Sequence, residues 1–196
     1  MRKKVSLLLS IIFIATSLFP NIVAFANEES NLASDKNSLD YKDMTQEELE
    51  ERINKLFDDA NSDVLTIESD ANKNSKNKYN LRGDHPYVGG DKVQLSLRRD
   101  IDTLTCRNVT TGAVYTCNYL NSYAGYNCGT RDSIGCFQGL LNCNYYALAV
   151  DGIFGNNTYN AVVDFQRRRN LDVDGIAGPK TFSVAVLITF EKSLNV

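Results

Sequence analysis

The sequence predicts a mainly α-helical fold: a three-helix bundle at residues 130–196, preceded by a small cysteine-rich element with a β-hairpin and by a disordered or helical leader. Two observations lead to this prediction. A nine-residue turn motif occurs twice near the C-terminus, each time before an amphipathic segment. All five cysteines lie within residues 106–143. We therefore divide the chain into residues 1–26, 27–80, 81–129 and 130–196.

Residues 1–26 have the pattern of a secretory signal peptide. Basic residues at positions 2–4 precede an apolar stretch, and residues 24–26 read Ala-Phe-Ala, a typical cleavage pattern. The apolar stretch is short for a membrane span, which needs about 20 residues. We expect an exported protein with no membrane association after cleavage, and the alternative is an uncleaved anchor.

The charge of the chain is uneven. Without residues 1–26 the chain keeps 18 of its 21 basic residues and all 24 acidic ones. The acidic excess lies in residues 27–80, whereas residues 130–196 hold six basic and six acidic residues. Nucleic acid is usually bound by a basic face, so this balance disfavours it as a partner.

One helix is predicted near residues 45–60 of the acidic leader. Thr45 and Glu48 form a capping-box pattern. Apolar residues follow at helical spacing: Leu49, Ile53, Leu56 and Phe57. Because a lone amphipathic helix is marginal in water, we expect it to dock on a protein partner or to remain a solvated spacer. The polar stretches beside it are expected to be flexible.

Residues 81–129 predict strands. Alternation at residues 93–97 indicates one strand, and residues 104–118 resemble a hairpin turning at positions 111 and 112. This register would place Cys106 opposite Cys117 and makes them a disulfide candidate, with one cysteine of the five left over. Metal binding is the alternative, but no C-x-x-C pair exists and the chain has one histidine. We expect no metal and no cofactor.

The repeated motif is the strongest signal. Residues 150–158 read Val-Asp-Gly-Ile-Phe-Gly-Asn-Asn-Thr, and residues 173–181 read Val-Asp-Gly-Ile-Ala-Gly-Pro-Lys-Thr. An Asp side chain can accept a downstream backbone N–H, and the Gly after it can take positive φ. We interpret six positions as structural turn residues: Asp151, Gly152, Gly155, Asp174, Gly175 and Gly178.

Three amphipathic helices are predicted around these turns. Their apolar positions are Ile134, Phe137, Leu140 and Leu141; Ala161, Val162 and Phe165; and Phe182, Ala185, Val186 and Phe190. Such a bundle has a small core, so it is marginal without a neighbouring element or a disulfide.

This pattern resembles the peptidoglycan-binding type 1 domain family. The resemblance is carried by residues 150–166, by residues 171–181 and by Phe137, Gln138 and Leu141 upstream, so it covers about the last third of the chain. It implies noncovalent binding of peptidoglycan, through the glycan strand or the stem peptide, and a secreted, wall-associated location. A near-neutral module would have to recognise a polyanionic wall by shape and hydrogen bonds.

Candidate contacts are residues that the turns do not need. Tyrosines can stack on a sugar face, and amide or guanidinium groups can reach a stem peptide. The candidates are Tyr145, Tyr146, Asn156, Asn157, Tyr159 and Arg167.

We expect a binding protein rather than an enzyme. Residues 27–129 contain no Cys–His pattern typical of a peptidase and no cluster of zinc ligands, although two carboxylates would suffice for glycoside cleavage. One alternative is a small peptidoglycan hydrolase or lytic-enzyme accessory with its catalytic residues in 81–129. Another is a structural or protein-interaction module that does not bind glycan.

Overall fold

The computed structural model describes residues 40–69 and 90–194, which belong to one compact unit spanning residues 38–196. The predicted signal peptide and most of the predicted flexible stretches lie outside the described residues. The helices are α1 (Gln46–Ala60), α2 (Arg131–Cys143), α3 (Asn156–Arg168) and α4 (Pro179–Leu194). The strands are β1 (Val64–Glu68), β2 (Val93–Arg98), β3 (Thr103–Asn108), β4 (Val114–Asn118), β5 (Ala124–Gly125) and β6 (Cys128–Gly129).

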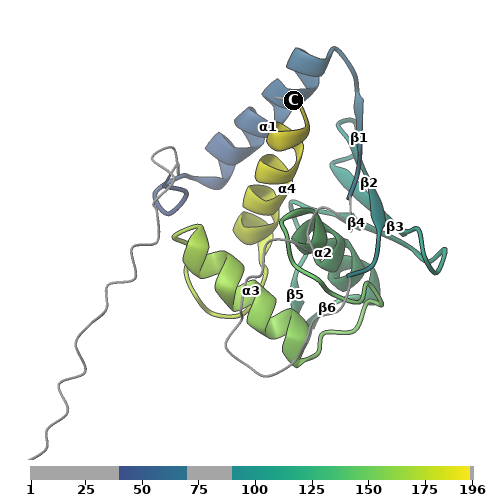
Figure 1. The fold of residues 1–196 in the computed structure, drawn as a ribbon. Coiled ribbons are helices and arrows are strands. Elements are labelled where there is room, and N and C mark those ends of the chain that lie inside the picture. The colour runs from purple at the N-terminus through teal and green to yellow at the C-terminus, as the bar shows by residue number, and fades with distance from the viewer. Residues whose placement is uncertain (1–39, 70–89, 195–196) are drawn as a thin grey trace, which may run out of the picture. The chain divides into compact units, whose positions relative to one another are not determined.

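The fold is mixed α/β, so the expectation of a mainly α-helical protein is wrong. Strands β1 to β4 form an antiparallel sheet in sequence order (Figure 1). Alternate residues of β2, among them Leu95 and Leu97, are fully buried on the face that α2 covers. The sheet and the helices share one hydrophobic core. The predicted strand at residues 93–97 and the predicted hairpin at residues 104–118 are present, but as parts of a four-stranded sheet and not of a small cysteine-stapled element.

The predicted Cys106–Cys117 disulfide is also wrong. The hairpin register pairs Cys106 with Tyr115 and Leu104 with Cys117, so the two cysteines are offset along the ladder. All five cysteines are free thiols. The physical reason is the turn: the Asn108 side chain accepts hydrogen bonds from the backbone of Thr110 and Thr111. This Asx-type cap stabilises a loop of residues 109–112 instead of a two-residue turn.

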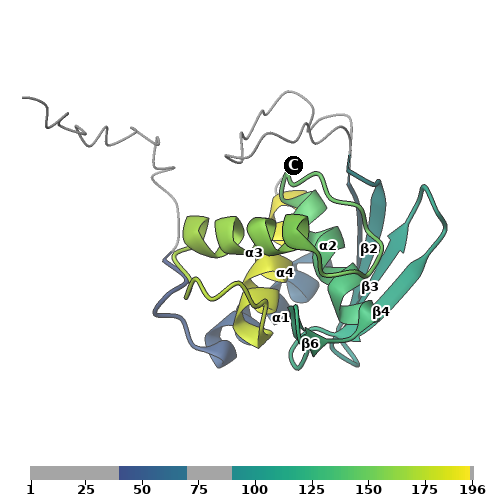
Figure 2. The same ribbon diagram turned by 90° about the horizontal axis from the view of Figure 1, so that it is seen from below.

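Helix α2 is the central element. It lies between the sheet on one side and α3 and α4 on the other (Figure 2), and residues 133–142 are all buried. Glycines allow its close approach to the sheet. A Cβ at Gly135 would lie 2.3 Å from the Tyr115 ring, and one at Gly139 would lie 2.4 Å from Cys106 Sγ. The expected bundle core is therefore completed by the strands.

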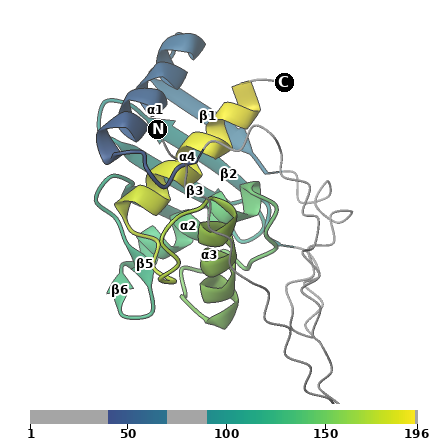
Figure 3. The ribbon, with the colours of Figure 1, turned by 90° about the vertical axis from the view of Figure 1, so that its left-hand side faces the viewer.

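Helix α1 packs along α4 (Figures 1 and 3). Its capping box is formed as predicted, and its apolar face is buried. Arg52 pairs with Glu191 at 2.9 Å, and Gln46 Nε2 donates to Ser183 Oγ at 2.8 Å. The leader helix thus has a partner within its own chain. Helix α4 is buried throughout residues 181–190 because α1 covers the side that α2 does not.

Across residues 40–69 and 90–194, none of the helices combines the length and apolarity that crossing a membrane requires.

Candidate ligand-binding surface

A buried glutamine organises the first turn. Gln138 Nε2 donates to Asp151 Oδ1 and to the carbonyl of Ile153, both at 3.0 Å. Its Oε1 accepts the backbone N–H groups of Asp151 and Gly152 at 3.1 and 2.9 Å. Asp151 Oδ1 also accepts the N–H of Ile153 within the turn. The side chain of Gln138 therefore replaces the backbone partners that this irregular segment lacks.

The second turn repeats this arrangement with Gln166. Its Nε2 donates to Asp174 Oδ1 at 2.8 Å and to the carbonyl of Ile176 at 3.0 Å. Its Oε1 accepts the N–H of Gly175 at 3.0 Å. Gly152 and Gly175 have φ of 71° and 73°, where glycine is favoured. Sequence reasoning missed the structural role of both glutamines, although each follows a phenylalanine of the repeated pattern and precedes its Asp-Gly pair.

Exposed tyrosines gather beside the second turn. We call Tyr123, Tyr126 and Tyr159 the tyrosine surface; their exposed fractions are 48, 52 and 36%. The Tyr126 and Tyr159 rings lie 5.5 Å apart, tilted by 32°. The Tyr159 ring covers Gly175, where an added Cβ would lie 2.2 Å from it. The Phe154 ring packs against Tyr126 in a T-shaped pair, with the ring centres 5.3 Å apart.

Backbone pairing fixes the position of this surface. The short β5–β6 hairpin carries Tyr126 between its strands. Ala124 of β5 exchanges two backbone hydrogen bonds of 2.9 Å with Ala177 of the second turn. A rigid turn thus aligns tyrosines from two distant parts of the sequence.

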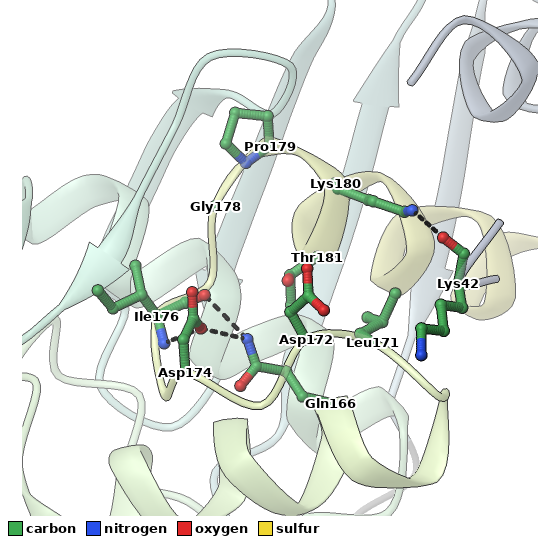
Figure 4. Close-up of a pocket in the computed structure, with 10 residues that line it drawn as sticks. All are labelled: Lys42, Gln166, Leu171, Asp172, Asp174, Ile176, Gly178, Pro179, Lys180 and Thr181. Carbon is green, nitrogen blue, oxygen red and sulfur yellow. Dashed lines mark hydrogen bonds between the residues drawn. The ribbon is translucent and has the colours of Figure 1, made fainter. Parts of the chain in front are cut away.

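A charged pocket opens between the second turn and the start of α4. Its volume is about 180 Å³, and it is shown in Figure 4. The lining residues are Lys42, Gln166, Leu171, Asp172, Asp174, Ile176, Gly178, Pro179, Lys180 and Thr181. Lys180 Nζ donates to the carbonyl of Lys42 at 2.6 Å.

The segment before α1 is held against this pocket. Asp40 Oδ1 accepts the backbone N–H of Lys42 at 3.0 Å and Asn170 Nδ2 at 2.8 Å. These two hydrogen bonds lower the pKa of the Asp40 carboxyl. Residues that precede the family-like segment by more than 80 positions therefore complete the pocket wall.

The structure brings only some of the predicted contact residues together. Tyr159 belongs to the tyrosine surface, and Asn156 adjoins it because Tyr126 donates its hydroxyl hydrogen bond to Asn156 Oδ1. Asn157 and Arg167 are exposed on α3.

The other two predicted contact residues lie beyond the C-terminal end of α2. Tyr145 is stacked under Lys192 Nζ, which lies 4.9 Å from its ring centre. The hydroxyl of Tyr146 donates to Asp164 at 2.9 Å, and burial together with this carboxylate raises the pKa of Tyr146. Tyr126 was not among the candidates, although it is the most exposed tyrosine of the surface.

Four of the five cysteines, all except the half-buried Cys128, are poorly placed to form an exposed reactive site. Burial raises the pKa of Cys106 and Cys136 far above the ordinary thiol value, and that of Cys143 to about 12. A hydrogen bond from Cys136 lowers the pKa of Cys117, which is itself buried. Within the described parts of the chain, no three His, Cys, Asp or Glu side chains lie together as metal ligands would.

Comparison with known proteins gives a family for the C-terminal segment. Residues 130–184 match the family described as putative peptidoglycan binding domain, which confirms the resemblance inferred from the repeated turn. Two spore cortex-lytic enzymes of Bacillus cereus are 46% identical over 50 residues, or 25% of this chain and 19% of each enzyme. The aligned part thus spans about a fifth of these relatives.

One solved structure was also found to be similar. It is a peptidoglycan-binding protein from Clostridioides difficile in complex with glutamine hydroxamate. The similarity covers 77% of this chain and 90% of that chain, with a TM-score of 0.41 and 21% sequence identity.

Proposed function

We propose, from the match of residues 130–184 to the putative peptidoglycan binding domain family, that this protein binds peptidoglycan noncovalently and contacts the glycan through the tyrosine surface. The observation that carries the proposal is the pair Tyr126 and Tyr159. Both rings are exposed and are aligned to within 32°. Tyr159 lies on α3 within the matched segment, and Tyr126 reaches it from the β5–β6 hairpin, just before that segment. The proposed role is that of a wall-associated binding protein.

The chemistry of tyrosine suits a sugar ring. An aromatic face offers apolar area at low entropic cost, and the phenolic hydroxyl offers a hydrogen bond at the rim. A pyranose has a matching structure, with C–H groups on its faces and hydroxyls around its edge. The six basic and six acidic residues of segment 130–196 make attraction by bulk charge weak, so contact of this kind would supply the affinity.

We also propose that residues 1–26 export the protein to the wall. The support is the basic, apolar and Ala-Phe-Ala pattern in the sequence. Sequencing the N-terminus of protein recovered from the wall or the medium tests this directly. Asn27 as the first residue is the expected result, and a protein retained with its original N-terminus would contradict it.

The test of binding is sedimentation with purified sacculi at moderate salt. Tyr126→Ala and Tyr159→Ala are each expected to weaken binding roughly threefold to tenfold, since one aromatic contact contributes about 0.5–1.5 kcal/mol. Tyr145→Ala is the matched control. It removes another half-exposed tyrosine, which lies beyond the C-terminal end of α2 and is not part of the tyrosine surface.

Three outcomes are informative. Absence of wild-type binding would refute the proposal. Equal losses of affinity for Tyr126→Ala and Tyr145→Ala would be compatible with peptidoglycan binding but would refute the role of the tyrosine surface in it. Release of soluble muropeptides from the sacculi would favour the hydrolase alternative.

A further inference from the structure

The charged pocket differs in chemistry from the tyrosine surface next to it. Lys42 and Lys180 bring two positive charges to its wall, and Asp172 and Asp174 bring two negative ones (Figure 4). One water needs roughly 10–15 Å³, so a cavity of about 180 Å³ admits a small organic group.

The first turn shows that the fold does not require the charges of Asp172 and Lys180. At the positions equivalent to Asp172 and Lys180, the first copy of the motif has Ala149 and Asn157. Both copies nevertheless form the same glutamine-centred turn. The charges of Asp172 and Lys180 are therefore available for a role other than folding.

The threonine that ends each motif shows the same contrast. Thr158 accepts a hydrogen bond from Gln138 Nε2 at 3.2 Å. Its equivalent Thr181 lines the pocket, and within residues 40–69 and 90–194 its hydroxyl has no hydrogen-bond partner. A donor and acceptor that the first turn uses internally is thus left facing the pocket in the second.

One side of the pocket is rich in donors. Helix α4 starts after Gly178, whose carbonyl accepts the N–H of Phe182 but which has no side chain to cap the helix. Among the described residues, no side chain accepts from the backbone N–H groups of Lys180 and Thr181. The Lys180 ammonium, held in place by the Lys42 carbonyl, retains further protons for an acceptor. A carboxylate fits this set of donors.

The other side is rich in acceptors. Asp174 uses Oδ1 for Gln166 and for the N–H of Ile176, which leaves Oδ2 outside these bonds. The carboxylate of Asp172 is exposed and, in the part of the chain that the structure describes, accepts no hydrogen bond. These two acids do not form a metal cluster with a third ligand in the described residues. An ammonium group would find acceptors in these two acids, and neither a cation alone nor an anion alone would use both the donors and the acceptors of the pocket.

We propose that the charged pocket binds a zwitterionic amino-acid head group, with its carboxylate at Lys180 and the start of α4 and its ammonium at Asp172 and Asp174. This inference rests on the proposed function, because a stem peptide that contains an uncrosslinked diamino dicarboxylic acid carries a free amino and a free carboxyl group on one side-chain carbon. The charged pocket would then bind the stem peptide, while the tyrosine surface contacts the glycan.

Three small probes test the charge requirement: D-alanine, N-acetyl-D-alanine and D-alaninamide. Each is titrated into the full mature chain labelled with ¹⁵N, and amide shifts of Lys180, Thr181 and Asp172 are followed. D-alanine is expected to bind with a dissociation constant on the order of millimolar, as a ligand of this size allows. The two probes that lack one charge are expected to bind at least about tenfold more weakly.

Variants separate the two sides of the pocket. Asp172→Asn and Lys180→Gln are each expected to weaken D-alanine binding about fivefold or more. The control is Asp132→Asn, which removes an exposed acid from the first turn of α2. Equal shifts with all three probes, or unchanged binding in both pocket variants, would overturn the inference. Sacculus binding without D-alanine binding would refute this inference alone, whereas loss of wild-type sacculus binding would refute the proposed function.

Discussion

Replacing Gln138 with leucine tests the role of the buried glutamine in the first turn. Gln138 is 1% exposed, and leucine has a similar volume, so the main loss is polar. The N–H groups of Asp151 and Gly152 would lose their acceptor, whereas the carbonyl of Ile153 would keep the N–H of Gly155 as a donor. An unsatisfied buried group costs about 1–3 kcal/mol, so two N–H groups alone predict a loss of about 2–6 kcal/mol.

Urea unfolding of the mature chain measures this loss. With a slope of about 2 kcal/mol per molar urea, the midpoint should fall by about 1–3 M. Gln46→Leu is the matched control. Gln46 makes one hydrogen bond to Ser183, and its buried Oε1 has no partner among the described residues, so its removal should cost less than about 1 kcal/mol. Similar midpoints for the two variants would refute the reasoning.

Three further predictions concern packing, thiols and pH. Gly139→Ala should lower the free energy of unfolding by about 1–3 kcal/mol, measured in urea, because its Cβ would lie 2.4 Å from Cys106 Sγ. Alkylation at pH 8 should modify Cys128 first, with Cys143 much slower because its pKa is about 12, and mass spectrometry should count five modified thiols after unfolding. Because the pKa of Asp40 is lowered in the folded protein, the ionised carboxyl stabilises docking of its segment above pH 3.8. This stabilisation should be lost as the pH falls through the lower folded pKa. The side-chain amide signal of Asn170, which donates to Asp40, should report the loss in NMR spectra.

The C-terminal helices and both turns could be predicted because their signals are local. Helical spacing, the capping box at Thr45 and the Asp-Gly pairs each act within a few residues. The packing of α1 was harder to predict because it depends on α4, more than 100 residues away. One signal was present: Val184, Leu187 and Ile188 widen the apolar face of α4 beyond what one neighbour would cover, and all three are buried.

The hairpin register shows where pattern reading failed, and the tyrosine surface depends on contacts that no local pattern carries. The loop at residues 109–112 depends on hydrogen bonds to the side chain of Asn108. The predicted register assumed a two-residue turn at positions 111 and 112 and did not consider this side chain. The hydroxyl of Tyr146, a predicted contact residue, donates a hydrogen bond to Asp164, which its position in the sequence does not indicate. Tyr126 lies outside the repeated motif, and only the backbone pairing of Ala124 with the second turn brings it beside Tyr159.

The central position of α2 has a consequence for anyone who wishes to graft this domain onto another protein. A fragment cut at residue 130 would carry the matched segment, yet it would strip the strands from one flank of α2 and α1 from the outer flank of α4. Such a fusion would display two bare apolar faces and is expected to aggregate. A fusion that begins before Asp40 would transfer the tyrosine surface and the charged pocket intact, so the portable unit is far longer than the motif that reveals it.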